Sequence, residues 1–230
     1  MDGKNKGYQL PKAVIFDLDG TLVDTEKIYH QGWHAVLAEY GVQVTEEQLN
    51  QLRGHTRTDN NSLVQSWLGG DEEKMLEARA KRDAYFDQAI ANGAIRVKSH
   101  ILTLLNFLKD RGVHLGVATS SYQKRGLSEL EASQLLQYFE VVVYGDQVQR
   151  GKPQPDIYQK ALEKLEVAAE EACAVEDSVT GLLSAVHAGL RTYFLPECDL
   201  TDEEKKYVDH PLNGGTFASA KELVDYLKER

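Results

Sequence analysis

The chain has 230 residues, a length that fits one large domain or a domain that carries a modest insert. Hydrophobic residues make up 42% and charged residues 27%, a composition typical of globular proteins that argues against disorder. The net charge of -10 repels phosphate backbones, so we expect neither nucleic-acid binding nor attachment to an anionic membrane. A small phosphorylated ligand stays compatible with this charge, because a local site can oppose the overall sign.

The sequence also bears on the compartment. No apolar run approaches the roughly 20 residues that a membrane helix needs, and the polar segment 1–9 does not resemble a secretory signal. The two cysteines, Cys173 and Cys198, lie far apart and are typical of free thiols in a reducing compartment. We therefore expect a cytoplasmic protein and, in the absence of a coiled-coil pattern, a monomer.

The predicted elements begin with the apolar, β-branched run 13–16, which is typical of a buried strand in a parallel sheet. Helical spacing then predicts helices over 25–40, around 63–68 and over 71–90, and Thr45 with Gln48 resembles a capping box. From residue 99 the pattern alternates. The helices expected there cover 101–111, 124–136, 156–165, 179–188 and 222–228, and the strands cover 113–118, 141–144, 172–175 and 192–195.

This alternation predicts the α/β class, with a doubly wound, Rossmann-like parallel sheet covered by helices on both faces. The block 25–97 reads as purely helical and interrupts the pattern after the first strand. We interpret residues 1–24 and 98–230 as the α/β core and residues 25–97 as an inserted helical domain.

Polar and charged residues follow several of the predicted strands. They are Asp17 and Asp19, Thr119, Ser120 and Ser121, Lys152, and Glu176 and Asp177. In open parallel sheets the carboxyl ends of the strands form the ligand-binding edge, so these side chains are expected to converge. Crowded carboxylates need a cation, and oxygen ligands of this charge suit Mg²⁺. A metal and a lysine would hold a phosphoryl group that one carboxylate attacks while a second protonates the leaving oxygen.

The run Phe16-Asp17-Leu18-Asp19-Gly20-Thr21-Leu22-Val23-Asp24 resembles the first motif of the haloacid dehalogenase (HAD) superfamily. Thr119, Lys152-Pro153 and Glu176-Asp177-Ser178 resemble the later motifs, in order and at suitable spacing. The resemblance covers nearly the whole chain, with the N-terminal tail and the region 198–216 weakly placed. The helical insert resembles the small cap of the β-phosphoglucomutase-like phosphatases.

The resemblance implies a role for each motif residue. Asp17 would be the nucleophile that becomes an aspartyl-phosphate, and Asp19 the general acid and base. Asp17, the backbone carbonyl of Asp19 and Asp177 would hold Mg²⁺, with Glu176 bound directly or through water. Thr119 and the Ser120 amide would hydrogen-bond the phosphoryl oxygens, and Lys152 would neutralise their charge.

The resemblance also narrows the reaction. Dehalogenases and phosphonate-cleaving relatives lack the second acid, so Asp19 favours a phosphomonoester hydrolase, with a sugar phosphate as the first expectation for its substrate. β-Phosphoglucomutases carry a histidine twelve residues beyond the nucleophile, where this chain has Tyr29 and places His30 one position later. That offset argues against the alternative of a phosphohexomutase. A catalytically silent HAD-like binding protein is the remaining alternative.

Two further features concern the insert. The loop 53–57 faces the active site in the family, so Gly54 and Arg57 are candidate substrate contacts, with a solvent-facing basic loop as the other interpretation. His30 and His34 lie four residues apart on one predicted helix face, which permits zinc binding. No third ligand is evident in the sequence, so we interpret them as surface or packing histidines.

Overall fold

A computed structural model describes residues 10–52, 57–197, 199–202 and 204–229. Its larger sheet has six parallel strands in the order β5-β4-β1-β6-β7-β8. The strands are β1 (Ala13–Phe16), β4 (His114–Ala118), β5 (Val141–Val143), β6 (Ala172–Glu176), β7 (Arg191–Phe194) and β8 (Asn213–Thr216). The predicted α/β class with a parallel sheet is therefore confirmed.

Helices cover both faces of this sheet. They are α5 (Ile101–Lys109), α6 (Gln123–Ala132), α7 (Asp156–Leu165), α8 (Val179–His187), α9 (Lys205–Val208) and α10 (Ala220–Lys228). Successive side chains of a strand point to opposite faces, so Val14 and Phe16 of β1 join one core cluster with α5 and α10, whereas Ala13 and Ile15 join another with α7. All four β1 side chains are buried, which explains why this strand reads as one continuous apolar run.

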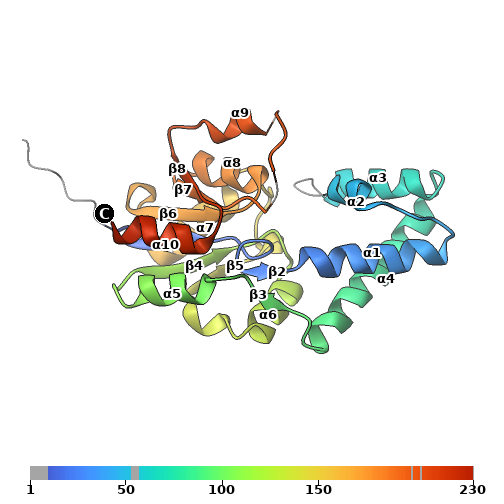
Figure 1. The fold of residues 1–230 in the computed structure, drawn as a ribbon, viewed down its shortest axis with the longest axis horizontal. Coiled ribbons are helices and arrows are strands. Elements are labelled where there is room, and N and C mark those ends of the chain that lie inside the picture. The colour runs from blue at the N-terminus through green and yellow to red at the C-terminus, as the bar shows by residue number, and fades with distance from the viewer. Residues whose placement is uncertain (1–9, 53–56, 198, 203, 230) are drawn as a thin grey trace, which may run out of the picture.

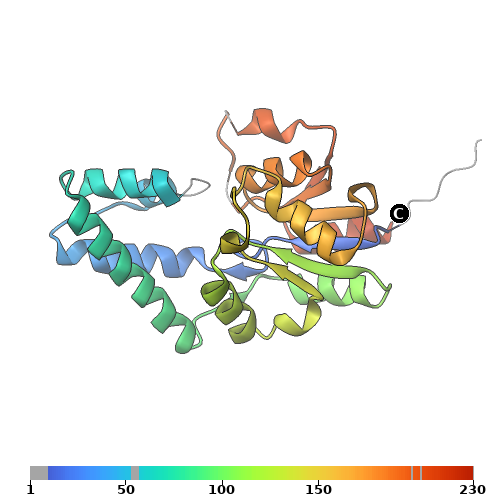
Figure 2. The ribbon, with the colours of Figure 1, turned by 180° about the vertical axis from the view of Figure 1, so that it is seen from behind.

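The helical insert lies to one side of the sheet (Figures 1 and 2). It comprises α1 (Glu26–Glu39), α2 (Glu46–Asn50), α3 (Arg57–Trp67) and α4 (Glu72–Ala91). The short strands β2 (Val23–Asp24) and β3 (Arg96–Val97) pair antiparallel where the chain enters and leaves these helices. The expectation of a purely helical block was therefore wrong at its end, because residues 96–97 pair with β2 and form a strand.

The insert is held together by its own apolar cluster. Trp33 and Leu37 of α1 pack with Val64 of α3 and with Met75 and Ala78 of α4. The predicted capping box is present, since Thr45 accepts from the Gln48 backbone and the Gln48 side chain accepts from the Thr45 backbone. None of the helices in the described ranges is both long and apolar enough to cross a membrane.

Candidate active site

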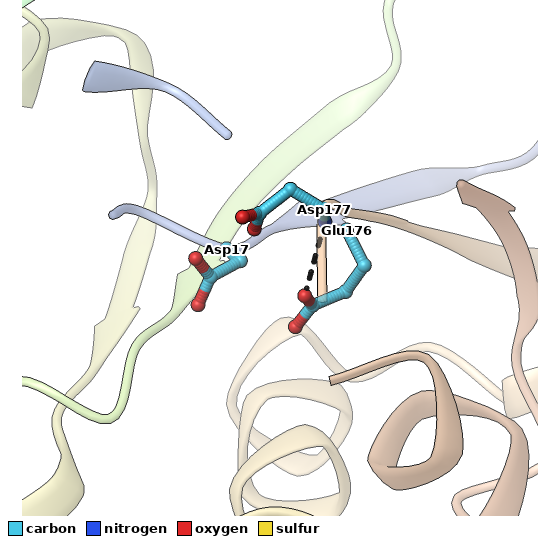
Figure 3. Close-up of side chains that lie close together, drawn as sticks. All are labelled: Asp17, Glu176 and Asp177. Atoms are coloured by element: carbon cyan, nitrogen blue, oxygen red, sulfur yellow. Dashed lines mark hydrogen bonds between the residues drawn. The ribbon is translucent and has the colours of Figure 1, made fainter. Parts of the chain in front are cut away.

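The side chains of interest meet at the carboxyl edge of the sheet, beyond the ends of β1, β4 and β6. Asp17 directly follows β1, and Glu176 and Asp177 lie at and after the end of β6. Each of these three acids offers a carboxylate oxygen, and the three oxygens lie within 4.8 Å of one another (Figure 3). The neighbouring strands β1 and β6 pair in register, with Phe16 opposite Val175, so residues far apart in the sequence are brought side by side.

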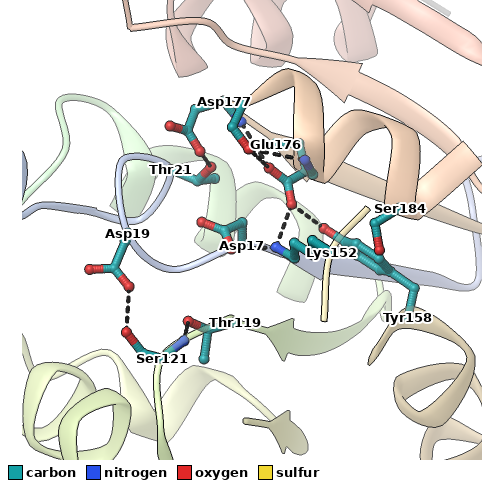
Figure 4. A network of polar contacts seen from close by, with 12 residues as sticks. Asp17, Asp19, Thr21, Thr119, Ser121, Lys152, Tyr158, Glu176, Asp177 and Ser184 are labelled. Carbon is teal, nitrogen blue, oxygen red and sulfur yellow. Dashed lines mark hydrogen bonds and ion pairs between the residues drawn. The ribbon is translucent and has the colours of Figure 1, made fainter. Parts of the chain in front are cut away.

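Lys152 lies between two of these acids. Its Nζ atom is 2.5 Å from Asp17 Oδ1 and 2.5 Å from Glu176 Oε1 (Figure 4). The side chains of all three residues are almost completely buried. Burial opposes the positive charge of Lys152, but the charges of Asp17 and Glu176 outweigh that cost and raise the pKa of the ammonium group. The lysine is therefore a fixed positive charge in a nearly dry site.

Glu176 is fully engaged by hydrogen-bond donors. Its Oε1 atom accepts from Lys152 and from the buried Tyr158 hydroxyl at 2.6 Å. Its Oε2 atom accepts from the Asp177 amide at 3.3 Å and from the Ser178 hydroxyl at 3.4 Å. Helix α8 passes close to this carboxylate, and Gly181 provides the room, because a Cβ added there would lie 2.0 Å from Glu176 Cδ.

The other two acids carry crowded negative charge. Burial, together with Glu176 and Asp19, raises the pKa of Asp17 to about 7 although Lys152 lowers it. Burial and the charges of Asp17, Glu176 and Glu197 raise the pKa of Asp177 well above its ordinary range, against one hydrogen bond from Thr21 Oγ1 at 2.9 Å. This arrangement suits a divalent cation, which would favour the ionised form of both groups.

Asp19 is positioned by two hydroxyl groups. Its Oδ1 atom accepts from Thr25 Oγ1 at 2.8 Å, and its Oδ2 atom accepts from Ser121 Oγ at 2.9 Å. Strand β1 ends at Phe16, so Asp17 and Asp19 both lie in the loop beyond it. The two hydroxyl groups fix the direction of the Asp19 carboxylate.

Thr119 and Ser120 follow β4 at the same edge. Thr119 is buried, and its Oγ1 atom accepts from the Ser121 amide at 3.0 Å, so its own hydrogen can be donated elsewhere. Ser120 is exposed, and a Cβ at Gly145 would lie 2.3 Å from its carbonyl oxygen, so a glycine is required there. Both residues are therefore placed beside the acids by β4.

Two candidate substrate contacts were expected in the insert. Gly54 lies outside the described residues, and Arg57 begins α3 with its side chain outside the described part of the structure.

Several site residues escaped the sequence analysis. Thr25 directly follows the first motif, so a search for hydroxyl partners of Asp19 could have found it. Thr21 lies inside the motif, but its partner is the distant Asp177, and no local signal marks that contact. Tyr158 reads as an ordinary core residue of its helix, and no sequence signal marks its contact with Glu176. The acidic Glu197 follows β7 and lies near Asp177, and its Oε2 atom would be 3.3 Å from a Cβ at Gly20.

The parallel sheet, together with the acids and the lysine that meet at its carboxyl edge, indicates the class of protein to which the chain belongs. The family model for haloacid dehalogenase-like hydrolases matches residues 14–195. The chain therefore belongs to this family of hydrolases.

Individual relatives cover almost the whole chain. It is 32% identical to the "Phosphorylated carbohydrates phosphatase" of Thermotoga maritima, over 95% of this chain and 99% of the relative. It is 27% identical to a mutant CbbY from Rhodobacter sphaeroides solved with xylulose-(1,5)bisphosphate, with a TM-score of 0.74 and coverage of 93% and 96%. A structure described as a predicted phosphoglycolate phosphatase from Haemophilus somnus shares the fold, with a TM-score of 0.82, 19% identity and coverage of 96% and 100%.

Proposed function

We propose that the protein is a magnesium-dependent phosphomonoester hydrolase that acts on a small metabolite through an aspartyl-phosphate. The observation that carries this proposal is the position of Asp17, whose carboxylate lies 2.5 Å from the Lys152 ammonium group and beside Asp177. A carboxylate in this setting can attack phosphorus, because the positive charge that binds the phosphoryl group stands next to it. Membership in the hydrolase family supports the same chemistry.

Asp17 and Asp177 are the residues that would hold Mg²⁺, together with the Asp19 backbone carbonyl. Glu176 fits a different task, because both of its oxygens already accept hydrogen bonds and one of them holds Lys152. We therefore assign Glu176 to orienting the lysine, with any link to the ion through water. When bound, the ion would supply positive charge opposite the transferring phosphoryl group.

The first step forms a bond between an Asp17 carboxylate oxygen and phosphorus and breaks the bond from phosphorus to the ester oxygen. Charge builds up on the phosphoryl oxygens, and Lys152 with the Thr119 hydroxyl and the Ser120 amide would stabilise it. These donors are in place before the reaction, since Lys152 is held by Glu176 and Thr119 by its contact with the Ser121 amide.

Asp19 would handle the proton. It gives its proton to the ester oxygen as the alcohol leaves, then takes a proton from the water that attacks the aspartyl-phosphate, so phosphate is released and Asp17 is restored. The hydroxyl groups of Thr25 and Ser121 hold its carboxyl group in a fixed direction. The carboxyl group that acts first as acid ends each cycle protonated again.

The insert would act as a cap over this edge of the core. Residues 25–97 are proposed as the cap domain, and residues 1–24 and 98–230 as the core. Arg125 of α6 in the core donates to the Tyr29 hydroxyl of α1 at 2.7 Å and to Asp83 of α4 at 3.1 Å. A cap held in this way would exclude water and strengthen the electrostatic interactions inside the site.

A sugar phosphate is the proposed substrate class. The Thermotoga maritima relative is named for phosphorylated carbohydrates, and the CbbY structure holds a sugar bisphosphate. Gly54 and Arg57 remain the candidate contacts from the insert for the part of the substrate beyond the phosphate.

We propose that the protein is cytoplasmic and monomeric. The free, buried Cys173 agrees with a reducing compartment.

Hydrolysis is favoured over a mutase reaction, in which the phosphoryl group moves from one position of the sugar to another. At the position of the mutase histidine, Tyr29 accepts a hydrogen bond from Arg125. His30 pairs with Glu46 and Glu26 of the insert. Incubation with β-glucose 1-phosphate separates the two activities, because a hydrolase releases phosphate whereas a mutase forms glucose 6-phosphate.

The test of the nucleophile is Asp17→Asn, assayed with p-nitrophenyl phosphate and Mg²⁺. We expect turnover to fall by at least about 10³-fold, because an amide cannot attack phosphorus. Asp202→Asn is the matched control, since Asp202 is fully exposed and pairs only locally with Lys205. Substantial turnover in Asp17→Asn, with circular dichroism like that of the wild type, would remove Asp17 from this role.

Asp19→Asn tests the proton-transfer role. Turnover of a sugar phosphate should fall much more than that of p-nitrophenyl phosphate, because nitrophenolate leaves without a proton. An equal loss on both substrates would contradict the assignment.

A further inference from the structure

The loop that carries Lys152 lies between β5 and α7, and its backbone belongs to no regular element. Residues 148–155 form neither helix nor strand. Within this loop the Gln154 amide donates to the Gly151 carbonyl at 3.0 Å, so Lys152 lies in a turn. A misplacement of about 1 Å can cost a large part of a catalytic rate, so a charge that stabilises a reacting group needs a firmly held backbone.

Helix α8 holds the backbone of this loop through two side chains. The Ser184 hydroxyl, which is fully buried, donates to the Gln154 carbonyl at 2.6 Å. His187 Nδ1 lies 3.2 Å from the Pro153 carbonyl oxygen, and because a carbonyl oxygen only accepts, the ring donates its Nδ1 hydrogen there. Ser184 and His187 are three positions apart, which makes them neighbours on the helix surface. One side of α8 therefore binds the two carbonyl groups that follow Lys152.

The same helix also contacts the partner of the lysine side chain. Gly181 precedes Ser184 by three positions, and a Cβ there would lie 2.0 Å from Glu176 Cδ, so the carboxylate packs directly on the helix. Glu176 Oε1 in turn accepts from the Lys152 ammonium group at 2.5 Å (Figure 4). Helix α8 thus supports Lys152 at both ends: its first turn contacts the partner of the ammonium group, and its later turns bind the loop backbone.

We propose that Ser184 and His187 are positioning residues for Lys152, which fix the loop backbone so that the ammonium group meets the transferring phosphoryl group in one place. This inference rests on the proposed function, in which Lys152 stabilises the phosphoryl oxygens. Lysine carries its charge on a flexible stem of four carbons, so its ion pairs alone do not fix the position of the ammonium group. Ser184 and His187 act through the lysine and do not touch the reacting atoms.

The ordinary interpretation is that these two hydrogen bonds only join α8 to the rest of the core. A serine inside a helix can also donate to the carbonyl four residues earlier in its own helix. Ser184 instead donates to the loop, and His187 donates to the preceding carbonyl of the same loop. The two interpretations differ in what the variants change: a structural role changes stability alone, whereas a positioning role also changes kcat.

Steady-state turnover of p-nitrophenyl phosphate with Mg²⁺ tests the proposal. In Ser184→Ala we expect kcat to fall about tenfold with little change in KM, because the loss falls on charge that builds up in the transition state. His187 is exposed, so His187→Ala should lower kcat only about two- to threefold. The amide nitrogen of asparagine can donate from nearly the place of Nδ1, so His187→Asn should restore most of that loss.

Thr192→Val is the matched control. The Thr192 hydroxyl is also fully buried and also donates to a backbone carbonyl, that of Leu190 at 3.3 Å. Thr192 lies near the start of β7, at the end of the sheet away from the acids. Its loss should lower Tm and leave kcat unchanged. A folded Ser184→Ala protein with the kcat of Thr192→Val would overturn the proposal.

A double-mutant cycle shows whether Ser184 acts through the lysine. Lys152→Met should itself lower kcat strongly, and wild-type turnover in that variant would contradict the proposed function itself. In the Lys152→Met background, adding Ser184→Ala should lower the residual kcat no further. A second loss as large as the first would show that Ser184 only supports the fold. If circular dichroism shows that Ser184→Ala does not fold, the exposed His187 decides, and an unchanged kcat in His187→Ala then overturns the proposal.

Discussion

The Lys98 ammonium group contacts the Glu197 carboxylate, which joins the end of the insert to the edge of the acidic cluster. Lys98 directly follows β3 and its amide donates to the Leu22 carbonyl, so it sits where the insert rejoins the core. Glu197 is only 8% exposed and is one of the charges that raise the pKa of Asp177. A positive charge on the returning segment therefore offsets one of the acids that crowd the site.

The contact between Lys98 and Glu197 predicts a measurable coupling energy between these two side chains. Lys98→Met should lower the free energy of unfolding by about 1–2 kcal/mol, because a largely buried carboxylate loses a charged partner while Lys98 itself is partly exposed. Adding Glu197→Gln should recover part of that loss. Urea unfolding of both single variants and the double variant measures the coupling energy, and losses that simply add would show that the contact contributes nothing.

The approach of α8 to Glu176 predicts a strong effect of Gly181→Ala. In an ordinary helix interior this change would stabilise the protein by up to about 1 kcal/mol. Here the added Cβ would lie 2.0 Å from Glu176 Cδ, so the carboxylate or the helix must shift. We expect a lower Tm and loss of most turnover on p-nitrophenyl phosphate.

Gly151→Ala is the control for that change. It lies next to Lys152, and a Cβ there would meet nothing within 4 Å, so both Tm and turnover should stay near the wild-type values. An unchanged Tm and turnover in Gly181→Ala would show that the close approach of α8 is not needed.

The central strands and the polar residues after them could be predicted from the sequence, because each leaves a local signal. The run 13–16 is apolar throughout since both faces of β1 are covered, and the motif acids follow directly. Parallel pairing then leaves one edge where Asp17, Lys152 and Glu176 can meet.

The strand β8 could not be predicted, because its sequence Asn-Gly-Gly-Thr has low strand propensity. Close packing requires these glycines: a Cβ at Gly214 would lie 2.9 Å from side-chain atoms of Arg191 and Tyr193 of the neighbouring strand β7. The requirement comes from the partner strand and leaves no pattern in the segment itself.

The supporting hydrogen bonds of the site were also beyond sequence reasoning. Thr21 donates to Asp177 across 156 residues, and Tyr158 reaches Glu176 from a helix that reads as ordinary core. Such partners are chosen by the geometry of the folded edge, and a threonine or tyrosine in a helix or turn has many other uses.

Tyr158→Phe tests one of these partners. Phenylalanine fills the same buried space but leaves Glu176 without this hydrogen bond, so we expect a loss of about 1 kcal/mol of stability and a severalfold fall in kcat. Tyr226→Phe, which removes a hydrogen bond to the Gly214 carbonyl away from the acids, should lower stability without changing kcat. A kcat in Tyr158→Phe equal to that of Tyr226→Phe would show that Tyr158 only supports packing.

The raised pKa values of Asp17 and Asp177 predict that Mg²⁺ binding releases protons near neutral pH. Without metal, burial and neighbouring acids raise the pKa of Asp17 to about 7, above the 3.8 of an ordinary aspartate. The folded protein thus holds more protons than the unfolded chain between these values. The stability contributed by this group is present below pH 3.8 and is lost as the pH rises through about 7.

A divalent ion favours the ionised carboxylates, so it should reverse this loss. We expect the Mg²⁺-induced rise in Tm to grow between about pH 5.5 and about pH 8, as protons no longer compete with the ion. Calorimetry near neutral pH in two buffers of different ionisation enthalpy should show proton release, and Asp177→Asn should abolish the Tm shift at every pH. A Tm shift that stays constant over this range, with no proton release, would show that these carboxyls are already ionised before the metal binds.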